Sequence, residues 1–493
     1  MGGAVQPAPY RPETAILELG PDFYDPVRPA DFPQAILRYR NQVQAAGVGL
    51  GGLGDDAWIR HFARFEPLPD NLAEPLALRY HGHQFRVYNP DIGDGRGFLF
   101  AQLRDGGGRL LDLGTKGSGQ TPYSRFGDGR LTLKGGVREI LATEMLEALG
   151  VETSKTFSLI ETGEALDRND EPSPTRSAVL VRLQHGHIRI GTFQRLATLG
   201  ETESLRRLTN YCLRHYYPQS RHCEDPGSEP GDEAISSDSA VEAGLLRSAR
   251  NDGGSAAATL LRHVTAATAR LAASYIAAGF VHGVLNSDNI AITAQSFDYG
   301  PWRFAPAWDG AFTAAYFDHA GLYAFARQPE AIHWDLVQLA ISLRQIEAAE
   351  PLTAELEAFP HLFQTALRDS VFARLGLQPG TLEFDMPLVA ALEETLSATR
   401  VPLDRFWFDW RGGRRPDHYA GFDELAALIA RHEPLPGARD HPYWSDPAPC
   451  SMLIDEVEAL WAALDERDDW APLNEKIAAI RRMGAAMRLE GPV

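Results

Sequence analysis

The stretch His282-Gly283-Val284-Leu285-Asn286-Ser287-Asp288-Asn289 is followed nine residues later by Asp298-Tyr299-Gly300. Kinase-type nucleotide sites use a loop His-x-Asp-x-x-x-x-Asn for a base and a metal ligand, and a later Asp-x-Gly for a second metal ligand. When the loop is aligned on its first His and last Asn, Val284 stands in the place of the base. Valine cannot accept a proton. Either the site is inactive, or Asp288 serves a different nucleotide chemistry.

The composition limits the class of protein. The chain has 493 residues and is 44% hydrophobic, which is enough for roughly two to three domains with ordinary cores. Lysine and arginine number 47 against 66 aspartate and glutamate, which gives a formal charge of −19. Such a charge argues against binding to nucleic acid or to an anionic membrane. A cationic site in this chain must therefore be local.

The chain carries no signal for export, lipidation or membrane insertion. No stretch approaches about 18 uninterrupted apolar residues, and the N-terminal residues match neither a secretion nor a myristoylation signal. Three cysteines without a Cys-x-x-Cys pair support neither a disulfide framework nor a cysteine zinc site: Cys212, Cys223 and Cys450. We expect a cytoplasmic monomer that binds no membrane and no nucleic acid.

The residue pattern predicts a sheet-rich first part and a helical second part. Strands are expected at 98–103, 109–116, 155–161 and 177–184, where the first two are joined by the glycine-rich turn 105–108. Residues before 70 are expected to be irregular apart from one helix near 33–46. Helical spacing of apolar residues predicts further helices at 134–149, 202–217, 256–280, 334–349, 354–375, 388–399, 422–431, 454–466 and 473–488.

These elements predict an α+β protein with a protein-kinase-like two-lobed fold, in which a small sheet-rich N-lobe precedes a large, mainly helical C-lobe. Residues 221–255 are rich in Glu, Asp, Ser and Gly without periodicity, and we interpret them as a flexible insertion. The expected divisions are an N-terminal extension that packs on the lobes at 1–69, a nucleotide-binding N-lobe at 70–195, a C-lobe at 196–435 and a helical C-terminal extension at 436–493.

Four charged residues fit the needs of a nucleotide site. Such a site uses a strand lysine to grip phosphate and a helix carboxylate to hold the lysine. Lys116 ends a predicted strand, and Glu139 lies on the following predicted helix. Arg182 interrupts an apolar strand, where its charge needs either phosphate oxygens or a neighbouring carboxylate as a partner. Arg189 follows seven residues later.

Several strings together resemble the selenoprotein O family of protein adenylyltransferases, which are kinase-like proteins once regarded as pseudokinases. The ten-residue string that begins at Lys116 is the most specific, and the resemblance covers about 70–330. One departure is Arg86, where the family usually has glycine. The matching strings are Tyr80–Phe85, Gly93–Arg96, Lys116–Arg125, Gly127–Arg130, Val137–Glu139, His282–Asn289 and Phe297–Gly300.

The resemblance implies transfer of AMP from ATP to Ser, Thr or Tyr hydroxyls of proteins, with Mg²⁺ or alternatively Mn²⁺. Asp288 would be the catalytic proton acceptor, while Asn289 and Asp298 would hold the metal ion. Glu139 would orient Lys116. The implied nucleotide contacts are Gly93, Gly95, Arg96, Lys116, Asp128, Gly129, Arg182 and Arg189. The residues leave two other interpretations open: a phosphotransferase acting on a small molecule or a protein, and a catalytically silent ATP-binding scaffold.

Overall fold

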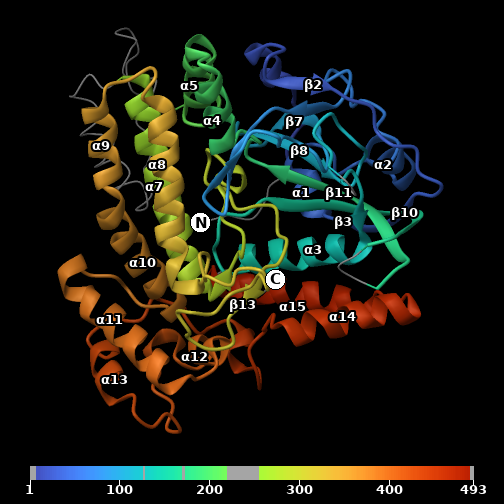
Figure 1. Ribbon diagram of the computed structural model, residues 1–493. Coiled ribbons are helices and arrows are strands. Elements are labelled where there is room, and N and C mark those ends of the chain that lie inside the picture. The colour runs from blue at the N-terminus through green and yellow to red at the C-terminus, as the bar shows by residue number, and fades with distance from the viewer. Residues whose placement is uncertain (1–6, 126–127, 169–171, 219–254, 489–493) are drawn as a thin grey trace.

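A computed structural model describes residues 7–125, 128–168, 172–218 and 255–488. An antiparallel sheet lies beside a large group of helices (Figure 1), so the predicted α+β class is confirmed. The predicted insertion at 221–255 falls outside the described residues except for its last residue.

The main sheet has nine strands in the order β2-β4-β7-β8-β11-β10-β3, with β1 paired to β7 and β9 paired to β11. Its strands are β1 (Pro12–Glu13), β2 (Tyr24–Pro26), β3 (Ile36–Arg40), β4 (Leu76–Leu78), β7 (Leu99–Arg104), β8 (Leu110–Lys116), β9 (Leu131–Thr132), β10 (Lys155–Leu166) and β11 (Thr175–Gln184). Two smaller antiparallel pairs are β5 (Gly82–Gln84) with β6 (Val87–Asn89), and β12 (Phe280–Val281) with β13 (Arg303–Phe304). The four predicted strands are confirmed as β7, β8, β10 and β11.

The N-terminal segment differs from its prediction. The expected helix near 33–46 is wrong, because this segment forms β3 and then only a short helix, α1 (Gln42–Gly47). β3 pairs with β10, while β1 and β2 pair with β7 and β4. By pairing with β10, β3 provides hydrogen-bond partners for backbone N–H and C=O groups that β10 would otherwise leave exposed at the edge of the sheet. That partner lies more than 100 residues away in the chain, so local sequence gave no sign of it.

The helices of the described residues follow the predicted order with shifted ends. They are α2 (Asp55–Phe62), α3 (Leu133–Ala148), α4 (Ile190–Leu199), α5 (Thr202–His215), α7 (Ala256–Ala278), α8 (Gln328–Leu343), α9 (Ala349–Glu357), α10 (Phe359–Leu375), α11 (Leu382–Thr399), α12 (Leu403–Asp409), α13 (Asp423–Ile429), α14 (Ile454–Arg467) and α15 (Ala471–Met487). The predicted helix 354–375 is divided into α9 and α10, and Pro360 is the second residue of α10, in the first turn, where a backbone N–H has no partner within the helix. α2, α4 and α12 were not predicted. Within this part of the chain, no helix has the length and apolar character needed to cross a membrane.

Apolar cores cover both faces of the sheet. Trp58 of α2 stacks on Phe157 of β10 with ring centroids 4.9 Å apart, and Val179 and Val181 of β11 join this core. Leu180, between those two valines, belongs to the core formed with α3. α14 and α15 lie against the other side of α3 (Figure 1). This packing fixes α3 and β8, the elements that carry Glu139 and Lys116.

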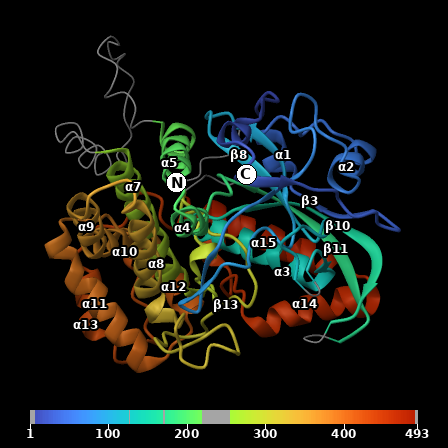
Figure 2. The ribbon, with the colours of Figure 1, turned by 45° about the horizontal axis from the view of Figure 1, so that its top comes forward.

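α7 is the central helix of the helical part, where it contacts α5, α8, α9 and α10 (Figure 2). It leads into β12, which pairs with β13 in the register Phe280 to Phe304 and Val281 to Arg303. The chain between these two strands contains both the 282–289 loop and the Asp298-Tyr299-Gly300 triplet. The pairing therefore brings the two parts of the motif back to the same place.

An ion pair joins the C-terminal helix to α3. Arg481 donates hydrogen bonds of 2.9 and 2.6 Å to the two carboxylate oxygens of Glu144. Tyr39 of β3 donates to the same carboxylate at 2.6 Å. Because Glu144 is buried, these two partners stabilise its negative charge in place of water.

We expect Arg481→Met to lower the free energy of unfolding, because it leaves a buried carboxylate without its cation. Breaking a buried pair costs about 3–5 kcal/mol, but the Arg481 side chain is 44% exposed, so we expect about 2 kcal/mol. Urea unfolding followed by circular dichroism measures the change. Arg467→Met on the exposed face of α14 is the control, and equal midpoints for the two variants would contradict the account.

Candidate functional site

Predicted site residues from distant parts of the sequence line one cavity of about 360 Å³. This volume is within the range of small-molecule sites. Glu139 and Gly129 are not among its lining residues; Glu139 lies behind Lys116, and Gly129 lies beside Gly119. The predicted residues that line it are Gly93, Gly95, Arg96, Lys116, Asp128, Arg182, Arg189, Asp288, Asn289 and Asp298.

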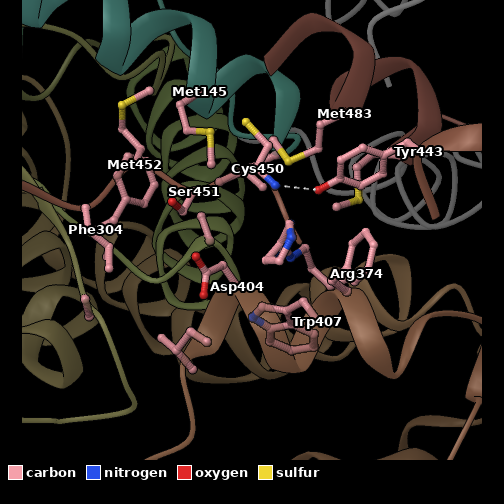
Figure 3. Close-up of a pocket in the computed structure, with 18 of the residues that line it drawn as sticks. Met145, Phe304, Arg374, Asp404, Trp407, Tyr443, Cys450, Ser451, Met452 and Met483 are labelled. Carbon is pink, nitrogen blue, oxygen red and sulfur yellow. Dashed lines mark hydrogen bonds between the residues drawn. The ribbon is translucent and has the colours of Figure 1, made fainter. Parts of the chain in front are cut away.

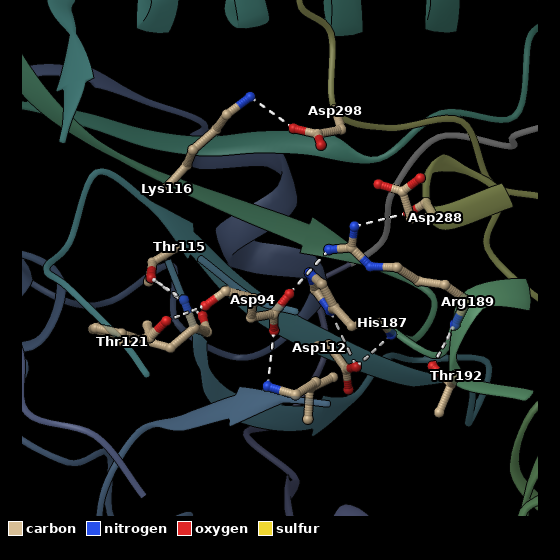
Figure 4. A network of polar contacts seen from close by, with 12 residues as sticks. Asp94, Asp112, Thr115, Lys116, Thr121, His187, Arg189, Thr192, Asp288 and Asp298 are labelled. Atoms are coloured by element: carbon tan, nitrogen blue, oxygen red, sulfur yellow. Dashed lines mark hydrogen bonds and ion pairs between the residues drawn. The ribbon is translucent and has the colours of Figure 1, made fainter. Parts of the chain in front are cut away.

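Lys116, the last residue of β8, places its ammonium between two carboxylates. Nζ donates to Oε1 of Glu139 and to Oδ1 of Asp298, both at 2.7 Å, and Figure 4 shows the second contact. Burial by itself lowers the pKa of Lys116, but the two carboxylates raise it above its ordinary value. The lysine is therefore a fixed positive charge that links the sheet, α3 and the Asp298 segment.

Two arginines that line the cavity each keep one guanidinium nitrogen without a hydrogen bond to the described residues. Nη1 of Arg182 and Nε of Arg189 are buried and have no hydrogen-bond partner among the described residues. Arg189 donates to the carbonyl oxygen of Asp288 at 2.9 Å and to Asp94 at 3.1 Å (Figure 4). A buried N–H group without a partner costs about 1–3 kcal/mol, and more when the group is charged. An anion with several oxygen atoms, such as a phosphate chain, would satisfy both.

Asp298 lies at the centre of this positive charge. Burial by itself raises its pKa, but the surrounding cations hold it well below the ordinary value: Lys116, Arg182, Arg96 and Arg189. Its backbone has a φ of +63°, which is uncommon for a residue other than glycine. The imidazole Nε2 of His282 contacts the carbonyl oxygen of Phe297 at 2.9 Å, which fixes the backbone just before Asp298.

Asp288 lies in the short 3-10 turn η3 (Ser287–Asn289). Burial raises the pKa of Asp288 to about 6, and its Oδ1 has no partner among the described residues. A carboxylate with a free oxygen and a pKa near neutrality is suited to accept a proton. Val284 lines the same cavity, but its side chain has no acceptor atom. Asp288 is the carboxylate of this loop that can act as a base.

Asn289 and Asp298 line the cavity with side-chain oxygen atoms of the kind that a small metal ion binds. The amide nitrogen of Asn289 donates to the carbonyl of Val284 at 3.0 Å, which leaves the amide oxygen available. Among the residues that the structure describes, no group of three or more His, Cys, Asp or Glu side chains is arranged to hold a metal ion. A pair of oxygen donors fits Mg²⁺, which commonly keeps one or two protein ligands and completes its shell with phosphate and water.

The β5–β6 hairpin packs on the 282–289 loop. The backbone N–H of His83 donates to Oγ of Ser287 at 2.8 Å, and that of Phe85 donates to Oδ1 of Asn286 at 3.0 Å. Gln84, between them, lines the cavity. The hairpin therefore holds the loop that carries Asp288 and forms part of the cavity wall.

Arg86, the departure from the family pattern, lies at the tip of this hairpin. Its φ is +63°, so the position has the left-handed conformation that favours glycine. The side chain pairs with Glu330 at 3.0 Å and lies 5.4 Å from the ring of Trp334, both on α8. Arg86 fastens the hairpin to α8 and is not a lining residue of the cavity.

Gly93 and Gly95 line the cavity, and they also allow the chain to pack closely against Tyr123. A side chain at Gly93 would lie 2.5 Å from the ring of Tyr123, and one at Gly95 would lie 2.7 Å from its carbonyl oxygen. Arg96, next in the loop, pairs with Asp128 at 3.5 Å. Contact with the segment around Tyr123 therefore requires the glycines whether or not a phosphate approaches them.

Two of the cavity residues that the sequence analysis did not assign to the site bond directly to its arginines. Asp94 pairs with Arg189 and accepts a hydrogen bond from the N–H of Leu78 at 3.1 Å. His187 lines the cavity and accepts a hydrogen bond from Nε of Arg182 at 3.4 Å. The available signals were weak: Asp94 lies inside the glycine string 93–97, and His187 lies in a turn between Arg182 and Arg189.

A second cavity lies between α3, α12 and the segment before α14 (Figure 3). Its volume is about 30 Å³, enough for about two water molecules. The lining is mainly apolar and includes four methionines: Met145, Met452, Met483 and Met487. It is too small for a nucleotide, so the larger cavity is the candidate site.

The chain resembles a known family over most of its length. Residues 8–425 match the family model described as "Protein adenylyltransferase SelO". The chain is 39% identical to the protein nucleotidyltransferase YdiU of Gloeobacter violaceus, over 95% of each chain. It is 38% identical to YdiU of Synechocystis, over 95% of this chain and 97% of the relative. With YdiU of Synechococcus elongatus the identity is 44%, over 80% of this chain and 72% of the relative.

The free guanidinium nitrogens predict that the cavity binds a polyanion. We expect Arg182→Met to raise the dissociation constant of inorganic pyrophosphate about tenfold or more, because a hydrogen bond to a charged group contributes about 1.5–3 kcal/mol. Isothermal titration calorimetry measures this constant. Arg206→Met on the exposed side of α5 should bind as the wild type does, and equal affinities for all three proteins would count against an anion site at Arg182.

Proposed function

Because the chain belongs to the SelO family of protein adenylyltransferases and is therefore a nucleotidyltransferase, we propose that it transfers AMP from ATP to hydroxyl side chains of proteins with the help of Mg²⁺. One observation carries the proposal. Lys116 lies 2.7 Å from both Glu139 and Asp298, in a cavity where two arginines have free nitrogens. The cavity therefore combines a fixed ammonium with guanidinium N–H groups that a phosphate chain would satisfy.

The proposal includes a protein-kinase-like, two-lobed arrangement. The N-lobe would comprise 70–195 and the C-lobe 196–435, with extensions at 1–69 and 436–493. Its support is the order along the chain of a strand lysine, a helix carboxylate, the 282–289 loop and the Asp298 triplet. β1, β2 and β3 pair within the main sheet, so the N-terminal extension would form part of the N-lobe sheet.

The phosphate chain of ATP would lie among the cations of the cavity. Lys116, Arg182 and Arg189 would neutralise its charge, and these groups need little reorganisation because carboxylates and aromatic rings already hold them. The remaining proposed nucleotide contacts are Gly93, Gly95, Arg96, Asp128 and Gly129. Asn289 and Asp298 would hold Mg²⁺, which supplies further neutralisation of phosphate charge when bound.

Transfer would use Asp288 as the base. The hydroxyl oxygen of the acceptor forms a bond to the α-phosphorus of ATP, and the bond from that phosphorus to the bridging oxygen breaks, so pyrophosphate leaves. The hydroxyl proton passes to Oδ1 of Asp288, the carboxylate oxygen without a partner among the described residues. Arg189, which donates to the carbonyl oxygen of Asp288, would keep this residue next to the phosphates.

The phosphorus that reaches the acceptor tests the proposal directly. We expect label from [α-³²P]ATP, and none from [γ-³²P]ATP, to appear on a mixed protein acceptor in the presence of Mg²⁺. Label from the γ-position would instead identify a phosphotransferase. ATP binding without transfer of either label would identify a silent scaffold.

If Asp288 is the base, replacing one of its carboxylate oxygens should greatly lower the rate of AMP transfer. Asp288→Asn keeps the size of the side chain but removes its basicity, so we expect kcat for AMP transfer to fall by about 10²–10⁴-fold with little change in ATP affinity. Asp404→Asn is a matched control, because burial also raises the pKa of Asp404 and that residue lines the second cavity. Wild-type kcat in Asp288→Asn would show that another group accepts the proton.

A further inference from the structure

The Arg182 guanidinium has few contacts that set its direction. Arg182 lies on β11 directly opposite Gly114 of β8. Among the described residues, its guanidinium donates one hydrogen bond, from Nε to Nε2 of His187 at 3.4 Å. Its Cζ also lies 5.0 Å from the centre of the Phe297 ring, and its Nη1 lies 3.8 Å from Oδ1 of Asp298, beyond hydrogen-bond distance. His187 is thus the neutral polar group that directs this cation.

His187 reaches Arg182 because Gly114 has no side chain. A Cβ atom at Gly114 would lie 2.2 Å from Nε2 of His187, so the imidazole fills the space left above this strand. Glycine within a strand weakens it and commonly marks a close approach by another group. The close approach here is that of a side chain from the turn after β11.

A chain of buried hydrogen bonds fixes the proton on His187. Oδ2 of Asp112 lies 2.8 Å from the backbone nitrogen and 3.2 Å from Nδ1 of His187 (Figure 4). Oδ1 of the same carboxylate accepts a hydrogen bond of 2.7 Å from Gln102, whose own oxygen accepts from the N–H of Ile16 at 2.7 Å. Nδ1 therefore carries the proton that is donated to Asp112, and Nε2 accepts from Arg182. Burial also lowers the pKa of His187, which favours this neutral form.

We infer that His187 is a positioning residue, which directs the Arg182 guanidinium so that its Nη1 stays beyond hydrogen-bond distance of Asp298 and can bind a phosphate group of the nucleotide. The inference rests on the proposed function, because it assigns His187 a part in holding the same ATP. Without the acceptor at Nε2, the guanidinium would be free to move so that Nη1 closes its 3.8 Å separation from Oδ1 of Asp298 to hydrogen-bond distance. Phosphate would then have to compete with that carboxylate for the same cation.

A pair of amide substitutions separates this role from packing. In His187→Gln the amide reaches the place of Nε2 and can still accept from Arg182. In His187→Asn it reaches only the place of Nδ1, so the contact with Asp112 is kept and the acceptor is lost. We expect the Kd for ATP with Mg²⁺, measured by calorimetry, to rise about tenfold in His187→Asn and no more than about threefold in His187→Gln.

Controls show whether the effect passes through Arg182. His185→Asn makes the same change two residues away in the same turn, at a histidine that does not line the cavity, and should leave ATP affinity unchanged. In an Arg182→Met background, His187→Asn should cause no further loss, since coupled residues are not additive. Thermal unfolding of each variant reports losses of stability separately from losses of affinity.

Three results would overturn the positioning role. The first is wild-type ATP affinity in His187→Asn. The second is an equal loss in the Asn and Gln variants, and the third is a loss that adds to that of Arg182→Met. The last two would each mean that the imidazole acts only as a packing group. If the wild-type protein itself bound no ATP, the proposed function and this inference would both fail. If the wild-type protein bound ATP and substitution of His187 left that affinity unchanged, the inference alone would be wrong.

Discussion

The ammonium of Lys116 lies between a carboxylate on a helix and a carboxylate on a loop, each at 2.7 Å, and the rest of the site is built around this contact. Three segments must meet for it to form: the end of β8, the middle of α3 and the turn at Asp298. The pairing of β12 with β13 returns the Asp298 segment to the 282–289 loop. α14 and α15 support α3 from its far side. Much of the fold therefore serves to hold one lysine in place.

Burying so many charges has a cost, which the structure offsets only in part. Glu139 and Asp298 satisfy Lys116, and Asp94 and the Asp288 carbonyl satisfy part of Arg189. Aromatic rings hold both guanidinium groups, and His187 also holds that of Arg182 through Nε. Donors that are fixed before a ligand arrives need little reorganisation to bind it. A polyanion would therefore meet a cavity already arranged for it.

The sequence predicted the parts of this site that depend on local pattern and order. Lys116 and Glu139 could be paired because a strand lysine and a helix carboxylate preceded the 282–289 loop in the expected order. The strands β7, β8, β10 and β11 followed from apolar runs and turn glycines. These features depend on residues that are close together in the chain or on their order along it, so the sequence alone was enough to predict them.

What the sequence could not predict depends on contacts between distant residues. The pairing of β3 with β10 is visible only once both strands are in place, and a helix was expected there instead. Asp94 gains its role from Arg189, 95 residues away. His187 gains its role from the empty space at Gly114. A positive φ at Arg86 has no signature in composition or periodicity.

The most direct test of the central claim is an experimental structure with Mg²⁺ and α,β-methylene ATP, in which the bond broken by AMP transfer is replaced by a stable one. The account predicts phosphate oxygens within about 3 Å of Lys116 Nζ, Arg182 Nη1 and Arg189 Nε, with the metal ion on Asn289 and Asp298. An analogue bound elsewhere on the molecule, or bound in this cavity with its phosphates turned away from those three nitrogens, would contradict it.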